Sequence, residues 1–347
     1  MKKAKNNMNL FKKVACFTDI HFGMKSNSRV HNDDCEAFVH WFIEQAKAQG
    51  CETCIFLGDW HHHRSSTNVS TMNYTVSNME RLSKAFENVY VIMGNHDLFY
   101  RDKREINSME FIRNIPNIHL VNEWIVEDDV AIIPWIVGDE YKKIQKMKQQ
   151  YVFGHFELPY FKMNAMVDMP DVGGIQTDHF AGCEQVFSGH FHKRQQMKNV
   201  TYMGNAFPHN YADAGDDERG MMTLEWGGAP QYINWPDMPR YRNYKISKLL
   251  NDADDLLQPN MYVRVSLDIK ISYEEANFIR ETFMEKYQLR ELQLIPEQVD
   301  QAQQPLVEIQ KFDSVDQIVL KQLEGVDSET YDKNILMAIY GNLDVKN

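Results

Sequence analysis

The chain has 347 residues, a formal net charge of −12 and a sequence pI of about 5.5. With 43% hydrophobic and 25% charged residues its composition is that of a soluble globular protein, and its length favours one large domain with a smaller one, or two to three domains. The acidic balance excludes a protein that holds nucleic acid by bulk charge alone, although it allows a nucleic-acid enzyme with a local basic patch.

No segment of the sequence predicts secretion or a membrane span. The lysine-rich first residues are not followed by an apolar stretch, and no run approaches the roughly 18 apolar residues of a membrane helix. The five cysteines lack the spacing of a disulfide framework, which favours reduced thiols and a cytoplasmic protein. Cys51 and Cys54 have zinc-like or redox-like spacing, but no second pair exists, so we expect free cysteines at the start of a buried strand.

The first two-thirds of the chain alternates strand-like and helix-like segments. Strands are expected at 14–18, 54–57, 89–93, 118–121, 131–134, 151–153 and 185–188. Helices are expected at 33–49, ending at Gly50, at 67–86 and at 138–149. This alternation predicts a layered α/β fold, and the short strand-like segments after residue 193 fit an antiparallel edge.

A smaller α/β module is expected further along the chain. The segment 234–244 carries two prolines and is typical of a linker. A strand at 261–269, a helix opened by a Ser272–Glu275 capping box and the strand-like stretch LQLIP follow it. The predicted organisation is a domain at 1–240, a module at 245–295, a linker at 296–312 and a helical segment at 313–347.

Five of the expected strands end in residue types that bind metal ions. The candidates are Asp19 and His21, Asp59, Asn95, His155, and His190 and His192. Because ligand-binding crevices of α/β sheets lie at the carboxyl ends of strands, these five loops should converge. A glycine comes first in four of the loops, and we expect it to let the backbone turn sharply there. A single histidine beside a glycine is more often a loop or core residue, so the inference depends on all five loops together.

The chemistry of this set favours a phosphate ester as substrate. It contains carboxylate, imidazole and amide groups without a thiol, which suits manganese, iron or zinc better than calcium. Two divalent ions carry more positive charge than the two aspartates remove, so the site would attract an anion. Two such ions can activate water and stabilise both oxygens of an in-line displacement.

In order along residues 19–192, the motifs D-x-H, G-D-x-x-H, G-N-H-D, G-H and G-H-x-H resemble those of the calcineurin-like metallophosphoesterases. Within that superfamily, GDWHH, GNHD, and YMGNAFP shortly after GHFH are most similar to the SbcD-type recombination nucleases, and to their phage members in particular. The resemblance implies a metallophosphoesterase β-sandwich flanked by helices, with a small α/β DNA-capping module and a helical C-terminal tail. It also implies two Mn²⁺ ions, or Mg²⁺, and a host-cytoplasm location if the chain is phage-encoded.

The same resemblance assigns roles to individual residues. The first metal would be bound by Asp19, His21, Asp59 and His192. The second metal would be bound by Asp59, Asn95, His155 and His190, with Asp59 as the bridge. His96 would contact the scissile phosphate and be oriented by Asp97, and His62 would lie near the DNA or the leaving strand. His61 and His63 match no family position, so we expect them to be exposed loop residues.

Basic residues follow three of the motif loops and are candidates for DNA binding. They are Arg64, Arg101, Lys103, Arg104, Lys193 and Arg194. If the loops line one crevice, these side chains would form a phosphate-binding edge on an acidic protein. Solvated surface loops are an equally good interpretation of the same residues.

The resemblance also implies partners: DNA and an SbcC-like coiled-coil ATPase that the tail would bind, although the tail could equally fold onto its own core. A homodimer within a heterotetramer would form through the regions 33–49 and 67–86. The leading function is a nuclease for recombination and double-strand-break repair, an exonuclease on duplex ends and an endonuclease on single strands. The alternatives are a phosphoesterase acting on a protein phosphate or small nucleotide, and a non-catalytic scaffold. The sequence lacks DRG after Asp59 and has GNHD in place of GNHE, which argues against a protein phosphatase.

Overall fold

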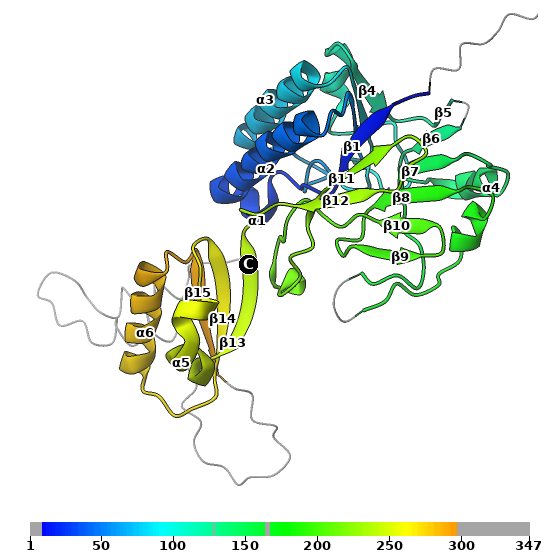
Figure 1. Cartoon of the computed structure of the whole chain (residues 1–347). Helices are drawn as coiled ribbons and strands as arrows, with labels where there is room; N and C mark the ends of the chain where they lie inside the picture. Colours follow the sequence, from blue (N-terminus) through cyan, green and yellow to red (C-terminus); the bar gives the residue numbers. More distant parts are fainter. Residues whose placement is uncertain (1–8, 128, 164–166, 297–347) are drawn as a thin grey trace, which may run out of the picture. The chain divides into compact units, whose positions relative to one another are not determined.

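The computed structural model describes residues 9–127, 129–163 and 167–296, which belong to one compact unit. Its first sheet has the strand order β12-β11-β1-β2-β3-β4 (Figure 1). The strands are β1 (Lys13–Phe17), β2 (Thr53–Phe56), β3 (Asn88–Ile92), β4 (Ile118–Val121), β11 (Gly220–Glu225) and β12 (Gln231–Asn234). Strands β1 to β4 are parallel, whereas β11 and β12 complete the sheet as an antiparallel edge.

The second sheet has the strand order β5-β6-β7-β8-β10-β9. Its strands are β5 (Ile125–Glu127), β6 (Val130–Ile133), β7 (Tyr151–His155), β8 (Gln185–Gly189), β9 (Gln195–Met197) and β10 (Val200–Tyr202). The four central strands are parallel, and the two edge strands are antiparallel to their neighbours. The predicted strands are therefore present within one or two residues of their expected bounds.

Both faces of strands β1, β2 and β3 are buried, which explains why these strands are almost continuously apolar. In β1, Val14 and Cys16 point into a core that also contains Phe153 and Phe187 of the second sheet. The alternate residues Ala15 and Phe17 belong to a separate core that the helices cover. The two sheets thus pack face to face as a sandwich, as the family resemblance implied.

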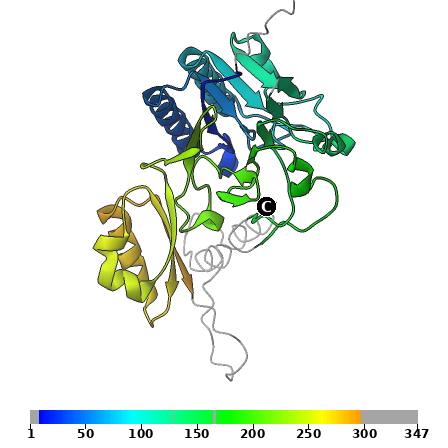
Figure 2. The same cartoon turned by 45° about the vertical axis from the view of Figure 1, so that its right-hand side comes forward.

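Two long helices cover the outer face of the first sheet. Helix α2 (Arg29–Ala48) and helix α3 (Val69–Ala85) lie side by side there in both views (Figures 1 and 2). The remaining short helices of the sandwich are α1 (Met24–Asn27), α4 (Tyr141–Ile144) and the 3-10 turns η1 (Glu110–Asn114), η2 (Gly138–Glu140), η3 (Thr177–Phe180) and η4 (Tyr211–Asp213). The predicted helix at 138–149 is therefore wrong in length, since only η2 and the single turn of α4 form there.

The smaller module has a three-stranded parallel sheet with the order β13-β14-β15. It consists of β13 (Arg240–Lys245), α5 (Ile246–Leu256), β14 (Met261–Leu267), α6 (Tyr273–Lys286) and β15 (Glu291–Pro296). The Ser272–Glu275 capping box is present at the start of α6, as predicted. The linker predicted at 234–244 is wrong in its second half, because residues from Arg240 onward pair with β14. Helix α5 was not predicted.

Side chains of the module contact the sandwich at defined points. The guanidinium of Arg290 forms two hydrogen bonds with the carboxylate of Asp34, and the hydroxyl of Tyr211 donates to Glu291 at 2.9 Å. The ammonium of Lys25 lies 4.2 Å from the ring centroid of Tyr262. Of the predicted linker at 296–312, Pro296 is the last residue of β15, and the rest of the linker and the predicted helical segment at 313–347 lie outside the described residues.

The structure also bears on the cysteines and on the expected absence of a membrane span. All five cysteines are buried and none forms a disulfide, and Cys51 and Cys54 lie at the start of the buried strand β2, where they were expected. In the part of the chain that the structure describes, no helix is long and apolar enough to cross a bilayer.

Candidate metal centre

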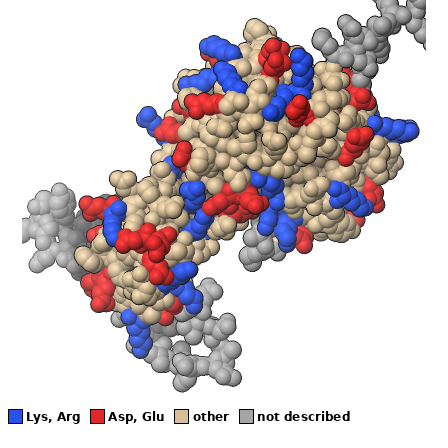
Figure 3. Space-filling view, in the orientation of Figure 1, with Lys and Arg blue, Asp and Glu red and all other residues tan. Residues whose placement is uncertain are grey.

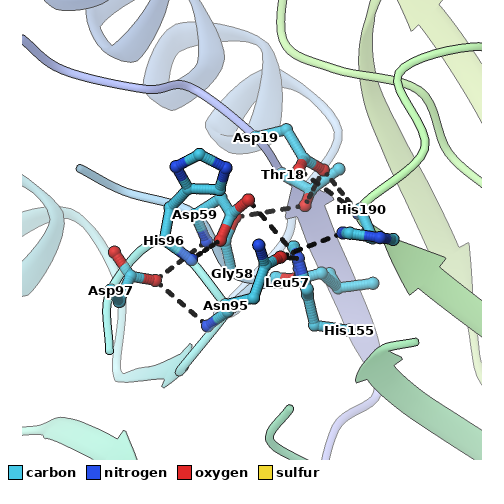
Figure 4. A network of polar contacts seen from close by, with 12 residues as sticks. Thr18, Asp19, Leu57, Gly58, Asp59, Asn95, His96, Asp97, His155 and His190 are labelled. Atoms are coloured by element: carbon cyan, nitrogen blue, oxygen red, sulfur yellow. Dashed lines mark hydrogen bonds and ion pairs between the residues drawn. The ribbon is translucent and has the colours of Figure 1, made fainter. Parts of the chain in front are cut away.

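Loops from both sheets converge at the carboxyl ends of their parallel strands. Asp19 follows β1, Asp59 follows β2 and Asn95 follows β3, whereas His155 ends β7 and His190 follows β8 (Figure 4). Since the two sheets pack face to face, the ends of their central strands meet, and all seven predicted ligands are brought to this one place.

One group of ligands consists of Asp19, His21 and His192. Their ligand atoms all lie within 4.8 Å of one another. The Oδ1 of Asp19 is 3.9 Å from the Nε2 of His21 and 4.0 Å from the Nε2 of His192. These are the spacings of atoms that surround a common point without bonding to one another.

The second group consists of Asp59, His155 and His190, with Asn95 beside them. The Oδ1 of Asn95 is 3.1 Å from the Nε2 of His155 and 2.9 Å from the Nδ1 of His190. An amide oxygen and two imidazole nitrogens thus face each other in this group.

Asp59 lies between the two groups. Its Oδ2 is 3.5 Å from the Nε2 of His155 and 3.7 Å from the Nε2 of His21. Burial would raise the pKa of Asp59, but the adjacent imidazole of His155 holds it well below its usual value. Burial lowers the pKa of His155 while the Asp59 carboxylate raises it, giving about 9. This position matches the expected bridge between two ions.

The donor set fits two divalent cations. Both ring nitrogens of His21 are buried and have no hydrogen-bond partner, which is costly unless a ligand occupies one of them. The Nδ1 of His155 donates to the carbonyl of Leu57 at 2.7 Å, leaving its Nε2 free to bind a metal. Oxygen and imidazole donors without a thiol suit Mn²⁺, Fe²⁺ or Zn²⁺.

The backbone of the ligand residues is strained. Asp19, His21, Asp59 and His190 have φ values of 50°, 53°, 63° and 91°, in the left-handed region that non-glycine residues rarely adopt. Such conformations persist where the surrounding structure imposes them, and they concentrate at functional sites. The sharp turns at the strand ends are therefore made mostly by the ligand residues themselves.

The glycines beside the ligands serve mainly to allow close approach, which corrects their predicted role. Four glycines directly precede candidate ligands, namely Gly58, Gly94, Gly154 and Gly189, and of these four only Gly58 has a positive φ, which is 102°. A Cβ at Gly94 would lie 2.2 Å from the Oδ1 of Asp59, and one at Gly189 would lie 2.9 Å from the Oδ2 of Asp19. Any side chain at these positions would displace a ligand.

Asp97 does not orient His96, contrary to the prediction. Its carboxylate accepts four backbone N–H groups, those of Asp59 and Gly94 at Oδ2 and those of Trp60 and His61 at Oδ1 (Figure 4 shows part of this network). Burial and the nearby Asp59 raise the pKa of Asp97 to about 7, while these donors favour its charged form. Asp97 therefore holds the loop that carries Asp59.

His96 lies at the edge of the site and is oriented by a different group. Its Nδ1 donates to the carbonyl of His62 at 2.7 Å, which leaves its Nε2 without that constraint. The rings of His62 and His96 are stacked with centroids 5.5 Å apart, and both approach His21. The structure thus brings His62 and His96 together beside the first ligand group.

His61 is buried, which corrects its expected exposure. Its Nδ1 is 2.7 Å from the hydroxyl of Ser108 and its Nε2 is 2.9 Å from that of Thr75. Burial lowers its pKa to about 4, so it is a neutral core histidine. His63 is half-buried at the surface.

An open cleft of about 300 Å³ borders the second ligand group and is the candidate substrate site. It is lined by Arg64, Asn95, His96, Arg101, Glu157, Met163, His190, Phe191 and His192. Glu157 was not predicted, although it follows His155 by two residues. Its carboxylate accepts from Arg101 at 2.5 Å and lies 3.3 Å from the Nε2 of His190, so it orients that imidazole.

Two further histidines hold the backbone of Asp19 and His21. The sequence did not predict a role for either of them. The Nε2 of His209 donates to the carbonyl of Asp19 at 2.8 Å, and the Nε2 of His31 donates to that of His21 at 3.0 Å. Both side chains are buried. His209 directly follows the YMGNAFP motif, which was its only signal in the sequence.

The predicted DNA-binding residues have different environments. Arg64 and Arg101 line the cleft, Lys103 is exposed nearby, and Lys193 lines a neighbouring hollow. The guanidinium of Arg194 packs 4.5 Å from the ring centroid of Tyr232. Among the described residues on the face in Figure 3, Lys and Arg side chains lie interspersed with Asp and Glu, without a continuous basic surface.

Arg104 is a correction to this set. It is 7% exposed, and its guanidinium binds the carboxylate of Glu140 through two hydrogen bonds of 2.7 Å. It also donates to the carbonyls of Asn122 and Trp135. The guanidinium of Arg104 is buried and its hydrogen bonds are made to these protein groups. Arg104 therefore does not form part of a phosphate-binding edge.

Comparison with known proteins agrees with this geometry. The family model described as calcineurin-like phosphoesterase matches residues 12–194. The chain belongs to the calcineurin-like phosphoesterase family, whose members bind two metal ions.

Individual similarities are more distant. Exonuclease subunit 1 of Enterobacteria phage T4 is 26% identical over 222 residues, which are 61% of this chain and 64% of that protein, so the match spans less than two-thirds of that relative. A dimetal phosphatase from Danio rerio is similar over 62% of this chain and 93% of its own, with 9% identity and a TM-score of 0.40. The nuclease MPE of Pseudomonas putida is similar over 62% and 84%, with 16% identity and a TM-score of 0.31.

Proposed function

We propose that this chain is the nuclease subunit of a DNA-processing complex and hydrolyses phosphodiester bonds with two Mn²⁺ ions. It would act as an exonuclease on duplex ends and as an endonuclease on single strands, in recombination and double-strand-break repair. The observation that carries the proposal is the position of the Asp59 carboxylate between two groups of candidate ligands, beside an open cleft. The phage T4 relative, which is named as an exonuclease subunit, supports a nucleic-acid substrate.

The side chains have separate tasks in this reaction. When bound, the two ions supply an activated water and offset negative charge on the phosphate. His96, oriented through its Nδ1 by the His62 carbonyl, presents its Nε2 to the phosphate or the leaving oxygen. Arg64 at the cleft would hold a neighbouring phosphate of the strand, and Arg101, which is paired with Glu157, would have to leave that carboxylate to do the same.

The partners are also part of the proposal. The segment 313–347 would bind an SbcC-like coiled-coil ATPase, and the module formed by β13 to β15 with α5 and α6 would cap the DNA. A homodimer within a heterotetramer would use the outer faces of α2 and α3. A phosphoesterase for protein phosphates or small nucleotides is the alternative function. It has less support, because the phage T4 relative is named as an exonuclease subunit.

The testing experiment measures nucleotide release from end-labelled linear duplex DNA with Mn²⁺. Asp59→Asn removes one charge from the bridging position, and we expect the rate to fall more than about 100-fold. Asp129→Asn is the matched control, since Asp129 is an exposed aspartate directly before the start of β6, at the opposite end of the strand from the ligand groups, and should leave the rate unchanged.

The result is interpreted together with the partner. If the wild-type chain releases no nucleotide, the ATPase subunit and ATP are added to the same reaction. Release that then appears supports the nuclease complex. Absence of release with the partner, combined with hydrolysis of bis(p-nitrophenyl) phosphate, would exclude the nuclease function in favour of another phosphoester substrate.

A further inference from the structure

Phe99 and Tyr100 form an exposed aromatic pair beside the candidate active site. Each side chain is 43% exposed, and their rings lie edge to face with centroids 4.7 Å apart. Phe99 follows His96 by only three residues, so their backbones lie within roughly 11 Å of each other. The next residue, Arg101, lines the cleft itself. The pair therefore adjoins the cleft along the chain, in the loop whose next residue belongs to the cleft lining.

The exposure of this pair is imposed by a well-anchored loop. The N–H of Phe99 donates to the carbonyl of Ile106 at 3.0 Å, and the indole of Trp135 donates to the carbonyl of Arg101 at 2.9 Å. The buried Arg104 fixes the loop from below through its ion pair with Glu140. These contacts keep part of each aromatic ring exposed to solvent. The exposure of apolar surface costs free energy, and a ligand that covers the rings would offset this cost.

The charges around the pair indicate the chemistry of that ligand. Lys103 places its ammonium 5.7 Å from the ring centroid of Tyr100, and Arg101 follows directly in the chain. Arg64 lies in the lining of the adjoining cleft. Aromatic rings interleaved with cations are the arrangement with which proteins bind single-stranded nucleic acid, since the rings stack on bases while the cations bind phosphates.

The geometry points to a base-stacking subsite: Phe99 and Tyr100 take an unpaired nucleobase of the strand whose phosphate lies in the cleft. This inference rests on the proposed nuclease function and specifies its substrate. Bases inside a duplex are stacked on each other and present no free face, so the subsite selects single-stranded DNA or a frayed end. It does not read the identity of the base, because every base has a face that can stack.

The test compares two oligomers that differ only in their bases. The full chain with Mn²⁺ is given an oligothymidylate, or an equally long deoxyribose-phosphate oligomer of abasic sites, and KM is measured for each. The wild type should have a KM about tenfold lower for the oligomer with bases, which corresponds to roughly 1.4 kcal/mol. Phe99→Ala/Tyr100→Ala should remove this difference while leaving the KM for the abasic oligomer unchanged.

Two variants make the result specific to stacking. Phe99→Trp/Tyr100→Trp should restore the preference for bases, and Ile106→Ala, at a 51% exposed apolar residue of the same loop, should retain it. Equal KM values for the two oligomers in the wild type, or a preference that survives the double alanine change, would overturn the inference and leave a protein-binding role for the pair. Hydrolysis of bis(p-nitrophenyl) phosphate without cleavage of either oligomer would instead overturn the proposed function, and the subsite with it.

Discussion

At the scale of single residues, the candidate metal centre depends on buried side chains that hold the backbone of the candidate ligands. Asp19 and His21 carry left-handed φ values, and the carbonyl of each accepts a hydrogen bond from a buried imidazole, His209 and His31 respectively. A strained segment held by two directed hydrogen bonds has little freedom to relax. The first ligand group is therefore preorganised before any ion binds.

This arrangement leads to a prediction for His209. His209→Phe keeps an aromatic ring against Phe207 but cannot donate to the Asp19 carbonyl, so Mn²⁺ affinity at one of the two sites should fall about 10- to 100-fold. Calorimetric titration with Mn²⁺ without substrate measures this change. His209→Gln, whose amide can donate, should recover part of the affinity. Two unchanged binding steps in His209→Phe would show that the hydrogen bond does not position the ligand.

At the scale of elements, the site is built from the ends of strands that belong to two sheets. Each parallel strand stops where its ligand loop begins, and glycine there allows the loops to approach more closely than any side chain permits. The carboxylate of Asp97 then ties the loop after β2 to the loop after β3 through backbone N–H groups. Backbone packing between loops thus sets the distance between the ligand groups.

We predict that Gly94→Ala damages the site more than the fold. The new methyl group would lie 2.2 Å from the Oδ1 of Asp59 and 2.5 Å from its backbone nitrogen, so it must move that carboxylate together with the loop that carries it. A displacement of about 1 Å costs roughly 100-fold in rate, so DNA or bis(p-nitrophenyl) phosphate hydrolysis should fall by that order. Gly228→Ala, whose nearest contact would be 3.1 Å from the Glu225 carbonyl, should keep its activity. Equal activity of the two variants would contradict the clash.

At the scale of the whole molecule, buried neutral histidines make the fold sensitive to acid. Burial lowers the pKa of His31 to about 3 and that of His61 to about 4, from an ordinary value of 6.5. Below about pH 6.5 the unfolded chain binds protons that the folded protein does not. The stabilising contribution of each histidine is therefore complete above pH 6.5 and is lost as the pH falls toward the folded-state pKa.

The expected size of this effect is testable with His61→Gln. From pH 7 to pH 5, the free energy of unfolding of the wild type should fall by up to about 2 kcal/mol more than that of the variant, since each pH unit is worth about 1.4 kcal/mol per group. Urea unfolding in the presence of EDTA measures this difference without a contribution from metal binding. An identical decrease in both proteins would show that His61 is protonated equally in the folded and unfolded states.

Much of the fold could be predicted because strand and helix periodicity is local. The helix predicted at 33–49 forms as Arg29–Ala48, and the seven metal-ligand candidates were identified from short motifs at strand ends. The errors have a common cause. Local pattern at 138–149 did not show that only η2 and the single turn of α4 form there, and at Arg240 a polar segment became a strand because β14 offered it backbone partners.

The sequence by itself determined which residues can bind metal and in which order their loops occur, because a motif at a strand end is written within a few neighbouring positions. Only the tertiary structure decided which polar residues serve the site from inside. Asp97 binds backbone groups near Asp59, Arg104 is neutralised by Glu140, and His209 holds Asp19 across a separation of 190 residues. The hydrogen-bond partners of these residues lie in segments that meet only after folding, so a local motif does not show which groups they will bind.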